Sequence, residues 1–140
     1  MNQDRFTIKA GEAVNGAVAA ASSAGHPEVT TLHLLRALTE AEDGIVPSVL
    51  SRLEAPVEEI GQRLAEAMGR LPRAVGAARP TASRGFQKAL QNAEKAAGRM
   101  KDDFIASEHL VLGIMEGEDE AAGILSSVGI DRPRFLEALK

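Results

Sequence analysis

Thr31-Leu32-His33-Leu34-Leu35 and Ser107-Glu108-His109-Leu110-Val111 are two similar stretches that lie far apart in one chain of 140 residues. Each has a hydroxyl residue first, a histidine third and a leucine fourth, followed by an aliphatic residue. Their separation is constant, because 107 minus 31 and 109 minus 33 both give 76. Similarity at a fixed offset indicates an internal repeat.

The similarity extends along much of the chain on both sides of these stretches. The further matches are Val14 with Leu90, Ala17 with Ala93 and Val29 with Ile105 at an offset of 76, and Leu50 with Leu125, Leu53 with Val128, Ile60 with Phe135 and Leu64 with Leu139 at an offset of 75. A slip of one residue in a loop accounts for the difference. We expect two units of common origin that pack about a pseudo-twofold axis, because neither can cover its hydrophobic face alone.

Apolar residues at three- and four-residue spacing predict helices in the first unit over residues 4–24, 31–43, 45–53 and 56–68. Gly25 and Pro27 mark the end of the first helix, and Thr31 is the expected cap of the second. No stretch alternates at period two. The predicted fold is therefore all-α, with eight helices in a pseudo-twofold double repeat of two four-helix units.

The chain has the size of one domain, residues 1–140. We assign residues 1–68 to the first repeat, 69–80 to a linker and 81–140 to the second repeat. The linker carries two prolines, two glycines and three arginines without an apolar period, which is typical of a surface connection.

Composition argues against several classes of protein. Lys and Arg total 16 against 20 for Asp and Glu, and the net charge of −4 favours neither nucleic acid nor a membrane surface as a partner. Cysteine is absent, which excludes disulfides and thiolate metal sites. No signal peptide or membrane-spanning stretch is evident. We expect a cytoplasmic protein that is monomeric in isolation.

The histidines do not indicate a metal site or a catalytic base. His33 and His109 occupy equivalent positions in the repeat, so we interpret both as hydrogen-bonding scaffold residues. His26 stands in a loop without a second ligand near it in sequence. We therefore predict no metal ion in this chain.

Positions that break the repeat are better candidates for function. Leu32 is replaced by Glu108 in the second half, and His26 is replaced by Asp102. The plain interpretation is a favourable charge just after a cap at Ser107 and an ordinary loop residue. The functional interpretation is a pair of carboxylates that contact a ligand.

Two further residues have a structural and a functional interpretation. Thr7, expected in the first turn of the first helix, can bond to nearby backbone or present its hydroxyl to a groove. Leu90, like its neighbour Phe86, is most simply a core residue, and it is functional only if its helix borders a cleft.

Four stretches resemble the Clp amino-terminal repeat domain family, and the first and third of them are most similar to the ClpB chaperones. The stretches are Asp4-Arg5-Phe6-Thr7, Leu32-His33-Leu34-Leu35-Arg36-Ala37-Leu38, Leu71-Pro72-Arg73 and Asp102-Asp103-Phe104-Ile105-Ala106-Ser107-Glu108-His109-Leu110. The resemblance covers essentially the whole chain. It implies a non-catalytic domain that recruits unfolded or aggregated protein segments to a hexameric ATPase ring, which threads them and works with the DnaK chaperone system.

The resemblance also implies a set of substrate-binding residues. Thr7, Asp102 and Glu108 match the implicated polar positions, and Leu90 with the vicinity of Leu110 matches an apolar groove. No cofactor is expected in this chain, because it contains no GxxxxGK[ST] phosphate loop. ATP and Mg²⁺ are expected in ATPase modules elsewhere in the parent protein, and the present chain is expected to be a domain excised from it.

Two positions depart from the family pattern. Lys101 stands where a glycine is often found, and Asn92 replaces an apolar groove residue of some relatives. The second change predicts a more polar groove that binds more weakly.

Other functions stay open from the sequence. The first alternative is an adaptor-binding amino-terminal domain of a ClpA- or ClpC-type unfoldase that feeds a protease. A second is a small Ser-His-Asp hydrolase, against which stand the missing G-x-S-x-G turn and the duplicated histidines. A third is a stand-alone repeat protein that acts as an adaptor.

Overall fold

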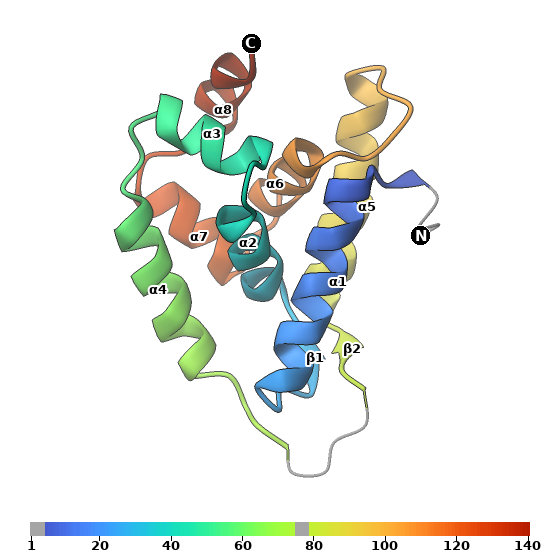
Figure 1. The fold of residues 1–140 in the computed structure, drawn as a ribbon, viewed down its shortest axis with the longest axis vertical. Helices are drawn as coiled ribbons and strands as arrows, with labels where there is room; N and C mark the ends of the chain where they lie inside the picture. Colours follow the sequence, from blue (N-terminus) through green and yellow to red (C-terminus); the bar gives the residue numbers. More distant parts are fainter. Residues whose placement is uncertain (1–4, 75–78) are drawn as a thin grey trace.

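The computed structural model describes residues 5–74 and 79–140, and every structural statement below concerns these two ranges. They form eight α-helices and two short strands (Figure 1). In chain order the elements are α1 (Ile8–Ser23), β1 (Glu28–Val29), α2 (Thr31–Glu40), α3 (Ile45–Arg52), α4 (Val57–Gly69), β2 (Thr81–Ala82), α5 (Arg84–Arg99), α6 (Ser107–Met115), α7 (Glu120–Ser127) and α8 (Arg132–Leu139). The predicted all-α class with eight helices is confirmed.

Helices α2 and α3 begin at the predicted residues, whereas α1 and α4 begin later than predicted. The first begins at Ile8 rather than residue 4, because Thr7 takes the cap position. The caps of α2 and α6 are Thr30 and Ala106, so the predictions of Thr31 and Ser107 as caps were each wrong by one residue.

Equivalent positions of the two halves share unusual backbone dihedral angles. Gly25 has φ +74°, and Lys101, 76 residues later, has φ +61°. Glu54 has φ +53°, and Gly129, 75 residues later, has φ +79°. These pairs end α1, α5, α3 and α7 in the same left-handed turn, which is common after helix C-termini. Helices α1–α4 therefore correspond to α5–α8.

The two halves exchange short extended segments. Strand β1 pairs in parallel with β2, with Val29 opposite Ala82. The equivalent pairing elsewhere is a parallel bridge between Phe6 and Ile105. Each half thus completes a strand pair with a segment of the other half. These pairs are too short to show a period in the sequence.

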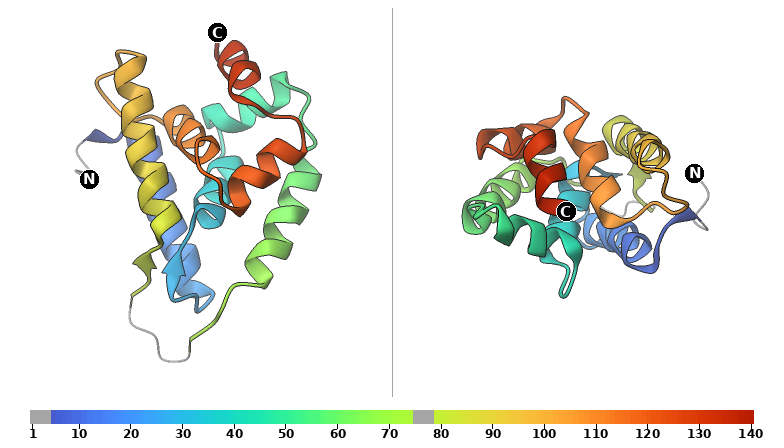
Figure 2. Two further views of the ribbon diagram at one scale, coloured as in Figure 1. Left: turned by 180° about the vertical axis from the view of Figure 1, so that it is seen from behind. Right: turned by 90° about the horizontal axis from the view of Figure 1, so that it is seen from above.

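One continuous hydrophobic core, mostly aliphatic, lies between the halves. Helices α2 and α6 lie in the middle, with α1 and α5 on one side and α4 and α7 on the other (Figures 1 and 2). The largest fully buried side chains are Phe135, Leu34, Leu35, Leu38, Ile60, Leu64, Ile105, Leu110, Leu112, Ile114, Leu125 and His33.

Residues 70–74 and 79–80, from the predicted linker, are irregular apart from a turn after α4 and are largely exposed. Residues 75–78 of that linker lie outside the described residues.

Candidate functional site

Thr7 holds the start of α1. Its Oγ1 accepts a hydrogen bond from the backbone N–H of Ala10 at 3.1 Å. Its own N–H donates to the carbonyl oxygen of Ile105 at 2.9 Å. The interpretation of Thr7 as a residue with a local backbone bond is confirmed, and the residue also joins the two halves.

Asp102 supports the buried His109. The N–H of Ala106 donates to Nδ1 of His109 at 2.8 Å, so the ring proton resides on Nε2. Nε2 then donates to Oδ2 of Asp102 at 2.8 Å. The histidine is 1% exposed, whereas 46% of the Asp102 side chain is exposed. Asp102 therefore satisfies a buried donor and still reaches the surface.

The first half contains the same arrangement with a different partner. The N–H of Thr30 donates to Nδ1 of His33 at 2.9 Å, and Nε2 of His33 donates to Nδ1 of His26 at 2.8 Å. The interpretation of His33 and His109 as hydrogen-bonding scaffold residues is confirmed.

The buried histidine pair resists protonation. Burial, the neighbouring His26 and the cation of Arg36 lower the pKa of His33 to about 4. Burial and the cation of Arg73 also lower the pKa of His26. Both imidazoles are therefore neutral at pH 7.

Glu108 is the second residue of α6, where the positive end of the helix dipole stabilises a carboxylate. Its side chain is half-buried and forms no hydrogen bond or ion pair with another described residue. Leu32, at the equivalent position of the first half, is 4% exposed. A core position of the first half is thus occupied in the second by a carboxylate without a side-chain partner among the described residues.

Of the two leucines expected to form an apolar groove, only Leu90 reaches the surface. Leu90 on α5 is partly buried, but Leu110 is 0% exposed and belongs to the core. Asn92 is 5% exposed and its amide nitrogen donates to the carbonyl oxygen of Gly113 at 3.5 Å. Asn92 therefore joins α5 to α6 and does not make a groove more polar, which corrects the sequence expectation.

Two exposed apolar side chains were missed by the sequence reasoning. Ile8 is 85% exposed and Phe104 is 54% exposed. They lie on the two segments that the bridge between Phe6 and Ile105 joins. We call Ile8, Phe104 and these segments, residues 5–8 and 102–106, the junction surface. The sequence offered one signal for them, because Ile8 and Phe104 are apolar residues that do not fit the spacing of the buried helix faces.

A pocket of about 280 Å³ adjoins the junction surface on the α1 side. Phe6, Thr7 and Ile8 line it together with Gly11, Glu12, Val14 and Asn15. The junction surface thus offers exposed apolar groups beside a small hollow.

Within residues 5–74 and 79–140, no group of three or more histidine and acidic side chains is placed to hold a metal ion. None of the helices in these ranges combines the length and apolar character needed to cross a membrane.

The model of the Clp repeat (R) N-terminal domain matches residues 5–128, and the chain belongs to this family. Among curated relatives, the chaperone protein ClpB of Rhodopirellula baltica is 31% identical over 136 residues, which cover 97% of this chain and 15% of the relative. The ClpB of Corynebacterium glutamicum is 34% identical over 134 residues, which cover 94% and 16%. The chain therefore spans about one sixth of the length of these relatives.

Solved structures share the fold. The N-terminal domain of Hsp104 from Candida albicans has a TM-score of 0.83 at 18% identity, with 96% of this chain and 88% of that chain covered. A complex of the ClpV N-domain with a VipB peptide has a TM-score of 0.78 at 22% identity, with 98% and 88% covered.

Proposed function

We propose that this chain is the substrate-recruiting domain of a ClpB-type disaggregase, which binds unfolded or aggregated polypeptide and delivers it to an ATPase ring. The observation that carries the proposal is the similarity to ClpB chaperones over 94–97% of the chain. The peptide complex of the ClpV N-domain supports peptide binding as a use of this fold.

The junction surface is the proposed docking surface. Ile8 and Phe104 are two of the four large apolar side chains that are most exposed among the described residues. Exposed apolar groups that lie on two joined segments can bury the side chains of an extended polypeptide. The adjoining pocket gives one such side chain a place to enter.

The five residues expected to bind substrate have different parts in this proposal. Glu108 contacts the bound segment, since its carboxylate has no partner among the described residues. Thr7 joins the first segment to the second through its backbone bond to Ile105. Asp102 fixes the second segment to His109. Leu90 is partly buried against the core and Leu110 lies within it, so these two residues act only through the packing of α5 and α6.

Binding through this surface should be weak. The contact area is small, and ordering a flexible chain costs roughly 0.5–1.5 kcal/mol for each immobilised side chain. Weak capture is compatible with release into a ring that acts on many different chains.

The experiment is a titration of the ¹⁵N-labelled domain with reduced, carboxymethylated α-lactalbumin, a permanently unfolded probe, followed by amide chemical shifts. We expect shifts at residues 5–8 and 102–108. Glu108→Leu should reduce them without loss of folding, because Leu32 occupies the equivalent position in the first half. Shifts confined to α4 and α8, or unchanged binding by this variant and by Phe104→Ser, would refute the proposed surface.

A further inference from the structure

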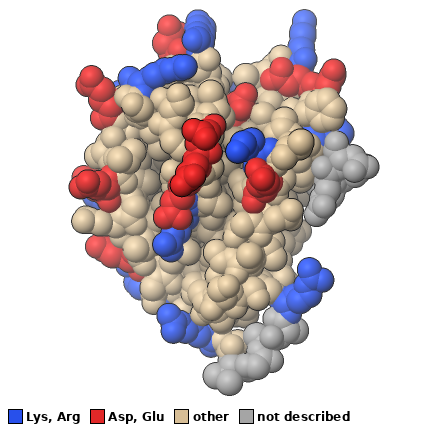
Figure 3. Space-filling model, in the orientation of Figure 1, with Lys and Arg blue, Asp and Glu red and all other residues tan. Residues whose placement is uncertain are grey.

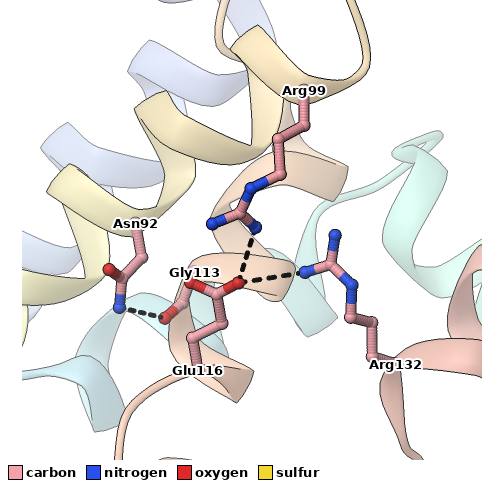
Figure 4. A network of polar contacts seen from close by, with 5 residues as sticks. All are labelled: Asn92, Arg99, Gly113, Glu116 and Arg132. Carbon is pink, nitrogen blue, oxygen red and sulfur yellow. Dashed lines mark hydrogen bonds and ion pairs between the residues drawn. The ribbon is translucent and has the colours of Figure 1, made fainter.

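Glu116 in the second half binds two arginines at once. Nη1 of Arg99, from α5, lies 2.9 Å from Oε1 of Glu116, and Nη1 of Arg132, from α8, lies 3.1 Å from the same oxygen (Figure 4). The Glu116 side chain is 28% exposed, which makes it the most buried partner of these two ion pairs. One carboxylate at this position of the fold can therefore hold two guanidinium groups.

The first half keeps the glutamate and lacks both arginines. Glu40 is equivalent to Glu116 at an offset of 76, and Ser23 is equivalent to Arg99 at the same offset. The residue equivalent to Arg132, at an offset of 75, is Val57.

Among the described residues, Glu40 pairs with one cation. Nε of Arg36, one turn earlier in α2, lies 3.3 Å from Oε2 of Glu40, with 47% and 64% of the two side chains exposed. Exposed pairs of this kind contribute little and exchange easily. Oε1 of Glu40 has no ion-pair partner among these residues.

A groove opens beside Glu40. We call it the α1–α2 groove. It has a volume of about 790 Å³ and is lined by Lys9, Glu12, Ala13, Gly16, Ala20, Ser23, Ala24, His33, Arg36, Ala37, Glu40, Ala41 and Glu42. Small residues such as Gly16, Ala20 and Ser23 leave it open. In the second half, the larger Asn92 and Arg99 occupy the positions equivalent to Gly16 and Ser23.

The charge around this groove favours a cation. Three glutamates, Glu12, Glu40 and Glu42, line it against the two cations Lys9 and Arg36, so three negative and two positive charges give a net −1. Acidic side chains also form a row across the face on which α1 and α2 lie (Figure 3).

We propose that the α1–α2 groove binds an arginine side chain of an extended polypeptide segment, whose guanidinium pairs with Glu40 as Arg99 pairs with Glu116. Arginine is preferred over lysine because its planar guanidinium donates several hydrogen bonds in a geometry that matches a carboxylate. None of the five substrate-binding candidates lines this groove. The site therefore deepens the proposed function by naming a basic substrate feature, and it can fail while the junction surface still binds.

The test uses two five-residue peptides with blocked ends, one with a central arginine flanked by alanines and one with the neutral isostere citrulline in its place. Each is titrated into the ¹⁵N-labelled chain. We expect saturable shifts at Gly16, Ala20 and Glu40 with the arginine peptide alone. Glu40→Gln should raise the dissociation constant roughly fivefold or more. Ser23→Arg, which copies the second half, should abolish these shifts by filling the groove.

Glu66→Gln is the matched control, because Glu66 is an exposed glutamate on α4 outside the groove and the variant changes the net charge equally. It should bind as the unaltered chain does. Equal shifts with both peptides, full affinity in Ser23→Arg, or an equal loss in Glu66→Gln would overturn the proposal. Binding of unfolded α-lactalbumin at residues 5–8 and 102–108 would persist in that case if the proposed function is correct.

Discussion

Lys101 adopts a left-handed backbone conformation, φ +61°, that costs an L-residue about 1 kcal/mol and costs glycine little. Its equivalent in the first half, Gly25, has the same turn without a side chain. Lys101→Gly should therefore raise the free energy of unfolding by about 0.5–1 kcal/mol. Urea unfolding of the chain measures the difference. The reverse change, Gly25→Ala, should lower it by a similar amount, and stabilisation by Gly25→Ala would contradict the argument.

Asp102 is a second residue at which the repeat supplies its own control. Asp102→Ala leaves the Nε2 donor of His109 buried without a partner, which should cost about 1–3 kcal/mol of stability. Asp102→His should cost much less, because His26 accepts the same bond from His33 in the first half.

Thermal unfolding of both Asp102 variants measures this difference. Equal destabilisation would show that the bond to His109 is not what Asp102 contributes. A loss of substrate binding in Asp102→Ala alone should accordingly be attributed to structure, whereas a loss in Asp102→His would indicate direct contact.

Among the elements, α5 and α6 pack closely against each other at Gly113. A Cβ atom on Gly113 of α6 would lie 2.3 Å from the carbonyl oxygen of Ala89 and 2.8 Å from the backbone nitrogen of Ala93. Both are backbone atoms and cannot move aside alone. Gly113→Ala should therefore destabilise the chain by about 2–3 kcal/mol as the helices separate.

Gly98→Ala is the control for this change. A Cβ atom at Gly98 of α5 would meet nothing within 4 Å, so alanine should stabilise the helix by about 0.5–1 kcal/mol. A denaturant midpoint below that of the unaltered chain for Gly113→Ala, and above it for Gly98→Ala, would support the close contact. A mild effect of Gly113→Ala would mean that α5 and α6 can separate at little cost.

The whole molecule should lose stability in acid through His33. The unfolded chain takes up a proton near pH 6.5, whereas the folded chain takes it up only near the lowered pKa of about 4. Between these values the unfolded state binds more protons than the folded state. The stability that depends on a neutral His33 is therefore fully present above pH 6.5 and is lost as the pH falls toward 4. Its size is on the order of 3 kcal/mol.

Urea unfolding at pH 7.5, 6, 5 and 4.5 measures this loss. His26→Asp, which copies the Asp102 and His109 pair, should flatten the profile, because a carboxylate partner favours the protonated imidazole of His33. An identical profile in the variant would assign the acid sensitivity to other groups.

Much of the molecule could be predicted from the offset of 76. It paired His33 with His109 as scaffold residues and identified Glu108 as a substitution for a core leucine. It could not show that Leu110 is wholly buried, since a leucine early in a helix suits a core or a groove equally. Nor could it place a cap at Ala106, because there the histidine three residues later accepts the backbone N–H.

The exchange of segments between the halves was also beyond sequence reasoning. Phe6 and Ile105 pair across 99 positions, and a bridge of one residue leaves no pattern of alternation. The junction surface follows from that pairing, so the sequence could not show that Ile8 and Phe104 lie on segments that are joined.

The exchanged segments also bear on how such a chain could arise. A shorter ancestor with only one repeat would carry both parts of the strand pair, one before its first helix and one after it, equivalent to Ala82 and Val29. Such a chain would find its missing partners in a second copy, as an isologous homodimer with two identical strand pairs. Gene duplication with a tether would turn that dimer into one polypeptide. Thereafter each half could diverge independently, which a true homodimer forbids, and a cleft could persist on one side while its twin filled in.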